Sequence, residues 1–74
     1  MLSFQIVESG RTINIFCDAK GVAVLLRTLA QLVEERATHV HLWTETATGG
    51  QLSEKTPFGE QAVKEVVIDY QEGD

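Results

Sequence analysis

Apolar and polar residues alternate in two short runs at the start of the chain. In residues 2–6 every second residue is large and apolar, and residues 12–17 repeat the alternation. Such a period of two is typical of a strand with one buried face. The polar residues 8–11, which include a glycine, separate the two runs and have the composition of a turn. We therefore predict a β-hairpin over residues 2–17.

The following segment changes to a helical period. Between residues 22 and 33, apolar residues recur at spacings of three and four, which predicts a single apolar stripe along one helix. Asp18 precedes this segment and is a suitable N-cap, because its carboxylate can accept a hydrogen bond from an amide of the first turn. We expect the helix to span residues 19–36. The predicted stripe consists of Val22, Leu25, Leu26, Leu29, Leu32 and Val33.

Two more strands are predicted in the second half of the chain. Residues 38–44 and 63–70 both alternate, so that each strand has one apolar face. Between them, residues 45–62 contain two adjacent glycines and a proline and show neither period. We expect this segment to be a long loop of the kind that often carries function, with Pro57 opening one short helical turn.

The resulting order β-β-α-β-β indicates an α+β protein that forms a single domain over residues 1–74. One helix can cover one face of one sheet, so we predict a two-layer sandwich with the helix on a four-stranded, mainly antiparallel sheet. In our expected strand order, 2-1-3-4, the first strand lies between the second and the third. Besides the helical stripe, the predicted core comprises Leu2, Phe4, Ile6, Ile13, Ile15, Val40, Leu42, Val66 and Ile68.

A single helix would leave the opposite face of this sheet uncovered. Phe16, Trp43 and Val67 on that face are more apolar than a solvated surface requires, which favours an interaction surface. The alternative is that these side chains pack against one another or under the long loop. The complete predicted face is Ser3, Gln5, Val7, Asn14, Phe16, His39, His41, Trp43, Val67 and Asp69.

The chain is acidic, and its charge is unevenly distributed. Its 74 residues contain 11 acidic and 6 basic residues, for a net charge of −5. Residues 1–37 are balanced, whereas residues 38–74 contain seven acidic residues and two lysines. This composition argues against binding nucleic acid or an anionic membrane, because both require a basic surface. An acidic half can steer a basic partner, or it can simply maintain solubility.

The cysteine content and the N-terminal residues suggest a cytoplasmic protein. Cys17 is the only cysteine, so no disulfide can form within the chain. The first residues lack the basic and apolar regions of a signal peptide, and no apolar run is long enough to span a membrane.

His39 and His41 are the only residues whose spacing suggests chemistry. Two imidazoles on one face of a strand could share a metal ion, with Asp69 or Glu45 as a third ligand. No further histidine and no cysteine cluster supports such a site, so we expect neither a metal nor another cofactor. The candidate nucleophiles Ser9, Ser53 and Cys17 have no base at a recognisable spacing, so we expect no catalytic residues.

The segment His39-Val40-His41-Leu42-Trp43-Thr44, followed by Gly49-Gly50-Gln51-Leu52-Ser53-Glu54, resembles the core motif of the immunity protein 32 family. That motif reads His-x-His-Leu-x-Thr, then Gly-Gly, then Leu-Ser/Thr-Glu. The family places an aromatic residue just before the glycine pair, where this chain has Thr48. Here Trp43 stands earlier, on the strand.

This resemblance implies a small cytoplasmic protein of bacteria that binds and neutralises a cognate toxin without catalysis. Nucleases, whose clefts are basic, are one toxin class that an acidic partner would suit. Two alternatives remain at this point: a homodimeric module that pairs the uncovered sheet face, and a metal-dependent enzyme at the histidine pair. We expect the toxin to be bound through an acidic surface and the 45–62 loop. The predicted partner-binding residues are Phe16, His39, His41, Trp43, Glu45, Gly49, Gly50 and Glu54.

Overall fold

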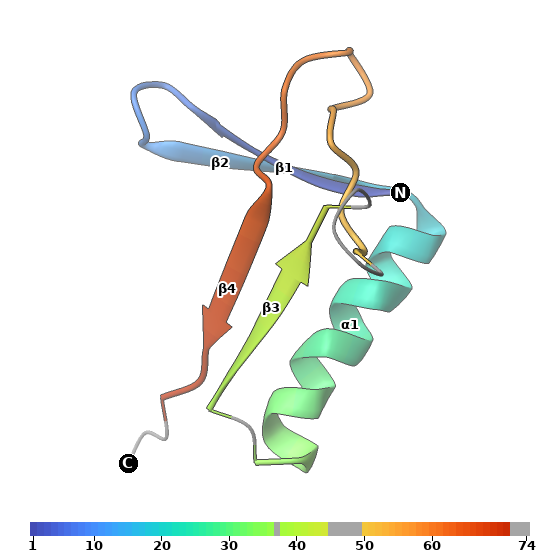
Figure 1. The fold of residues 1–74 in the computed structure, drawn as a ribbon, viewed down its shortest axis with the longest axis vertical. Helices are drawn as coiled ribbons and strands as arrows, with labels where there is room; N and C mark the ends of the chain where they lie inside the picture. Colours follow the sequence, from blue (N-terminus) through green and yellow to red (C-terminus); the bar gives the residue numbers. More distant parts are fainter. Residues whose placement is uncertain (37, 45–49, 72–74) are drawn as a thin grey trace.

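The computed structural model describes residues 1–36, 38–44 and 50–71, and its elements follow the predicted order (Figure 1). The helix ends two residues before its predicted end, and the last two strands are shorter than predicted at both ends. Both differences are of the size expected where helices and strands fray. The elements are β1 (Leu2–Val7), β2 (Thr12–Cys17), α1 (Ala19–Glu34), β3 (His39–Trp43) and β4 (Glu65–Asp69).

The predicted hairpin is confirmed. β1 and β2 pair antiparallel, with Leu2 opposite Cys17 and Ile6 opposite Ile13. The turn is closed by a hydrogen bond from the Gly10 amide to the Val7 carbonyl, 3.2 Å long. Gly10 has a φ of 85°, a conformation that a residue without a Cβ adopts without strain.

Asp18 caps α1 as predicted, and it also holds the start of the chain. Its Oδ1 accepts a hydrogen bond from the Gly21 amide at 2.9 Å and another from the terminal ammonium of Met1. Gly21 is needed here because the first turn of α1 passes close to β1: a Cβ on Gly21 would lie 1.9 Å from the Met1 carbonyl oxygen. The helix therefore meets the hairpin through its smallest residue.

The four strands form two separate sheets, so the single four-stranded sheet and the order 2-1-3-4 are wrong. One sheet is β1–β2 and the other is β3–β4, both antiparallel. The chain that follows Gly50 lies between them and bonds to both. The Ser53 amide donates to the Leu2 carbonyl at 2.8 Å, and the Leu52 amide donates to the Trp43 carbonyl at 2.7 Å. These bonds occupy strand edges that direct pairing of β1 with β3 would need.

Part of the predicted loop is a small hairpin-like turn. The Ala62 amide donates to the Glu54 carbonyl, and the Thr56 amide donates to the Glu60 carbonyl at 2.8 Å. The buried hydroxyl of Thr56 accepts hydrogen bonds from the amides of Phe58 and Glu60. A β-turn thus stands where we expected a short helical turn at Pro57.

The core is smaller than predicted, and it includes a residue of the predicted loop. Leu52 is fully buried, and Val63 packs beside it. Ile6 and Ile13 are exposed, contrary to prediction, because the turn end of the β1–β2 hairpin projects past β4 (Figure 1). Ile15, which pairs with the buried Phe4, is also exposed, contrary to prediction. The buried apolar residues are Leu2, Phe4, Leu32, Leu42 and Leu52, with Val24, Leu25, Val63, Val66 and Ile68 partly buried around them.

The predicted helical stripe is only partly buried. α1 faces the core through Gly21, Thr28 and Leu32, and Val24 and Leu25 lie half-buried beside them. The tight approach at Gly21 fixes this face toward the hairpin. The other four residues of the stripe, contrary to prediction, are exposed: Val22, Leu26, Leu29 and Val33.

We predict that Leu32→Ala lowers the free energy of unfolding by about 2–5 kcal/mol, because Leu32 is 3% exposed and its removal leaves a cavity. Ile13→Thr, at a strand position that is 63% exposed, should change it by about 0.5 kcal/mol or less. Urea denaturation of both variants measures the difference. Equal midpoints would contradict the observed face of α1.

We also predict that the contribution of Asp18 to stability disappears in acid. The hydrogen bond from the terminal ammonium, followed by that from the Gly21 amide, lowers the pKa of Asp18 below its ordinary value. A lowered pKa in the folded state means that the stabilisation is complete above the ordinary pKa and is lost as the pH falls through the lower one. Thermal denaturation should therefore show wild type more stable than Asp18→Ala at pH 7, with the two melting temperatures converging at low pH. A constant difference down to pH 2 would contradict this assignment.

Candidate partner-binding surface

The face of β3–β4 that points away from the core carries three of the eight predicted partner-binding residues: His39, His41 and Trp43. Val40 and Leu42 point inward, and the alternating residues of β3 point outward as predicted. The antiparallel register places Asp69, Val67 and Glu65 of β4 opposite them. We call this surface the outer β3–β4 face: His39, His41, Trp43, Glu65, Val67 and Asp69.

Three rings form a row along this face. The His41 ring stacks on the Trp43 indole, with 5.2 Å between ring centroids and 10° between ring planes. The His39 ring meets His41 edge-on, with 5.0 Å between centroids and 80° between planes. Both arrangements are favourable for aromatic rings. The contacts restrict each side chain, so the row is ordered before anything binds to it.

Glu65 holds the central ring from the neighbouring strand. Its Oε2 lies 2.8 Å from His41 Nδ1, and both side chains are more than one-third exposed. Sequence reasoning missed Glu65, although alternation puts it on the same side of its strand as Val67 and Asp69. Its contact with His41 could not be predicted, because only the pairing of β3 with β4 places this carboxylate diagonally across from His41. On the other side of the row, His39 Nδ1 lies 3.2 Å from Thr38 Oγ1.

The outer β3–β4 face combines apolar area with charge. Trp43 is 43% exposed and Val67 is 45% exposed, although both are large and apolar. Glu65 and Asp69 add carboxylates at opposite ends of β4. An aromatic residue surrounded by polar groups is the composition that protein–protein interfaces favour at their centre.

Phe16 does not belong to this surface. It lies on the other sheet, where its ring packs against Phe58 with 5.9 Å between centroids and a near-perpendicular angle of 78°. The turn that contains Phe58 covers this side of the hairpin, and Ser3 on the same side is completely buried. The continuous uncovered face predicted from the sequence is therefore divided, and for Phe16 packing under the loop is the correct alternative.

Of the predicted glycine pair, the structure describes only Gly50. Gly49 lies outside the described residues, and so does Glu45. Gly50 has a structural reason to be glycine, because a Cβ there would lie 1.7 Å from the Thr44 carbonyl oxygen. Glu54 is exposed at the start of the small turn. A role for these residues in partner binding stays a prediction.

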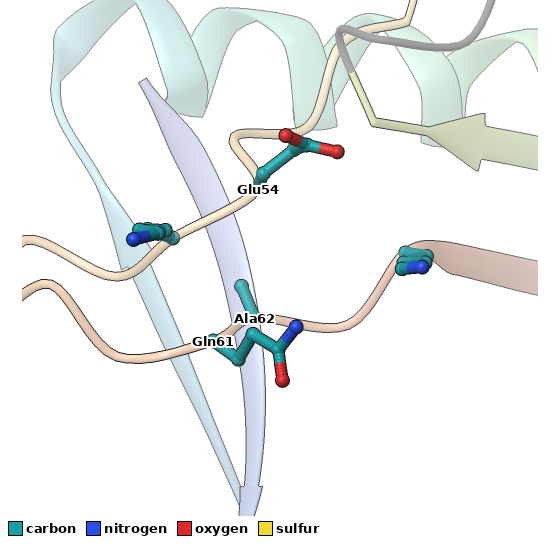
Figure 2. Close-up of a pocket in the computed structure, with 5 residues that line it drawn as sticks. Glu54, Gln61 and Ala62 are labelled. Atoms are coloured by element: carbon teal, nitrogen blue, oxygen red, sulfur yellow. The ribbon is translucent and has the colours of Figure 1, made fainter.

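Glu54 borders a shallow pocket of about 150 Å³ beside this turn (Figure 2). Glu54 comes from one arm of the turn, and Gln61 and Ala62 come from the other (Figure 2). Carboxylate, ammonium and amide groups all line the pocket, so it has no single charge preference. The lining is Glu54, Lys55, Gln61, Ala62 and Lys64.

Within residues 1–36, 38–44 and 50–71, no three His, Cys, Asp or Glu side chains come close enough to hold a metal ion. The same ranges contain no helix with the length and hydropathy needed to cross a membrane. The Cys17 thiol is exposed and not disulfide-bonded, and Cys17 lies on the hairpin rather than on the outer β3–β4 face.

No protein-family model, curated protein or solved structure matches the chain. The geometry of the outer β3–β4 face and the sequence motif that it displays are therefore the basis for assigning a function.

We predict that Gly50→Ala is strongly destabilising, because the added methyl group cannot fit beside the Thr44 carbonyl unless the backbone moves. The expected loss in the free energy of unfolding is about 3 kcal/mol or more. Gly10→Ala is the matched control: its φ of 85° is strained for alanine, but no atom lies within 4 Å of the added Cβ. Denaturant titration of both variants should show the larger loss for Gly50→Ala. The reverse order would mean that the chain does not pass so closely there.

Proposed function

We propose that the protein is a non-catalytic immunity protein that binds a cognate bacterial toxin through the outer β3–β4 face and so neutralises it. The observation that carries this proposal is the exposed row of three stacked rings. His39, His41 and Trp43 belong to the segment that resembles the immunity protein 32 family, and they are also the residues that α1 and the core leave uncovered. Residues that stay exposed contribute little to folding, which makes a binding role the better explanation of the motif.

The row is suited to binding because its side chains are already ordered. Immobilising a flexible side chain at an interface costs about 0.5–1.5 kcal/mol. Stacking against His41 restricts Trp43, and the contact with Glu65 restricts His41 in turn. Tryptophan is among the residues that most often dominate binding energy. Trp43, with the apolar Val67 across the strand pair, is the expected centre of the interface.

Charge makes a basic toxin the favoured partner. Glu65 and Asp69 lie on the outer β3–β4 face itself, and residues 38–74 carry the whole net charge of −5. An acidic surface accelerates encounter with a basic one and can occupy a cleft built for phosphate groups. A nuclease toxin has such a cleft. This function places the protein in the cytoplasm of the cell that makes the toxin.

The kinetics of binding to the toxin encoded by the adjacent gene test this function. We predict that Trp43→Ala mainly raises the dissociation rate, because a desolvated aromatic anchor determines residence time. Asp69→Lys should mainly slow association, and association of wild type should slow with added salt, since exposed charges are screened over about 10 Å at 0.1 M ionic strength. Glu8→Lys, at the turn of the β1–β2 hairpin, makes the same change in net charge away from the proposed interface.

Surface-based kinetics at several salt concentrations separate these effects. Protection of cells that express the toxin supplies the functional readout for each variant. Wild-type kinetics for both Trp43→Ala and Asp69→Lys would show that the toxin binds another surface. Absence of any binding, together with absence of protection, would refute the immunity function itself.

A further inference from the structure

α1 carries a second apolar face that the fold does not use. Val22, Leu26, Leu29 and Val33 are all exposed, and Leu26 and Val33 are each 62% exposed. Helical periodicity places these four on one side of α1, next to the buried face of Gly21, Thr28 and Leu32. We call them the exposed stripe. Ala19, Ala23 and Ala30 are also exposed and extend the same side with small apolar residues.

The spacing of the exposed stripe is the same in both directions. Successive members are four, three and four residues apart, so a reversed copy of the helix presents the identical pattern. In an antiparallel pair related by a two-fold axis, Val22 faces Val33 of the second copy and Leu26 faces Leu29 of the second copy. Alternating spacings of three and four are those by which two helices pack in a coiled coil. An interface that pairs one patch with itself is the kind found in symmetric dimers.

The charged residues of α1 lie away from the exposed stripe. Lys20, Arg27 and Glu34 follow one another at intervals of seven residues, and the turn of about 100° per residue in an α-helix places their column about 130° around α1 from the stripe. Ala19, Ala23 and Ala30 lie between the stripe and this column. Contact along the stripe therefore buries no charge of α1, and the small alanine side chains allow a second helix to approach closely.

The distribution of charge over the whole chain also favours contact through this helix. Two copies of a chain with a net charge of −5 repel each other most where the acidic residues gather. Residues 1–37, which include α1, carry no net charge. Contact through α1 therefore brings two copies together with less repulsion than contact through residues 38–74. A chain of 74 residues also gains from association, because a core of this size supplies limited stability.

We propose that the occupant of the exposed stripe is a second copy of this chain, so that the protein is a homodimer held by antiparallel pairing of α1 with α1. The toxin-binding proposal does not depend on this dimer, because the outer β3–β4 face and the exposed stripe share no residue. Each copy would keep its own row of rings.

Sedimentation velocity of the full chain over a wide range of concentrations tests the dimer. Wild type should reach twice the chain mass of 8.2 kDa as the concentration rises. Leu26→Glu should remain monomeric where wild type is dimeric, because it places two charges inside the interface. Ile13→Glu is the matched control, since Ile13 is 63% exposed but lies on the hairpin, and it should leave the dimer intact. Unchanged far-UV circular dichroism would confirm that each variant is folded.

Charge exchange tests the antiparallel direction. Leu26 faces Leu29 of the second copy in this arrangement, so Leu26→Glu or Leu29→Lys alone should abolish dimerisation by placing two like charges inside the interface. In the double variant Leu26→Glu/Leu29→Lys each glutamate faces a lysine of the second copy, which should restore dimerisation in part. In a parallel pair like charges would still face one another, and the double variant would stay monomeric.

Three results would overturn the proposal. A wild-type chain that stays monomeric would show that a second copy does not cover the exposed stripe. A dimer that survives Leu26→Glu but dissociates with Ile13→Glu would place the interface on the hairpin. A double charge exchange that fails to restore dimerisation would exclude the antiparallel pairing.

Discussion

The passage of the chain between the two sheets, from Gly50 to Ser53, holds this small fold together. Leu52 is fully buried at its centre, and its backbone bonds to β3 while that of Ser53 bonds to β1. The parallel bridge between Thr44 and Leu52 requires so close an approach that only glycine fits at position 50. A strand edge left unbonded inside a core costs free energy, so this segment satisfies polar groups and fills the core at once.

The extent of the core follows from this arrangement. With Leu52 and Val63 occupying the space between the sheets, the core needs only the base of the β1–β2 hairpin, the inner face of β3–β4 and one face of α1. Ile6 and Ile13 at the far end of the hairpin are left exposed, as is the second apolar side of α1. A domain of this size cannot cover all of its apolar residues by itself. The uncovered ones are therefore the natural places for contacts with other molecules.

The outer β3–β4 face and the exposed stripe differ in character, which suits them to different partners. The first face is aromatic, acidic and held in place by the contacts of His41 with Trp43 and Glu65. Its net charge selects against another copy of the chain and in favour of a basic protein. The stripe on α1 is aliphatic and symmetric in its spacing, and it lies in the half of the chain that has no net charge. The proposed self-association through the helix and the proposed toxin binding through the sheet are therefore compatible.

The sequence by itself determined the local structure. Alternation placed all four strands, and it also identified which side of β3 and β4 would be exposed, so His39, His41 and Trp43 were placed correctly. The period of the helix located α1, and Asp18 marked its start. These features depend on neighbours along the chain, where backbone geometry alone fixes the direction of each side chain. The apolar pattern of α1, however, includes both the residues that face the core and those of the exposed stripe. Periodicity cannot separate the two, because it records hydrophobicity and not the presence of a neighbour.

Only the tertiary structure decided how the elements meet. The close contact of Gly21 with the Met1 carbonyl determines which face of α1 is buried. Leu52 lies between β1–β2 and β3–β4, so the expected single sheet is divided into two. The pairing of β3 with β4 brought Glu65 to His41, and the turn near Phe58 covered Phe16. Each of these contacts is between residues distant in the sequence. Each formed because different segments of the chain compete for the same strand edge or the same space in the core. That competition depends on the shape and hydrogen bonding of the whole chain, which no local pattern contains.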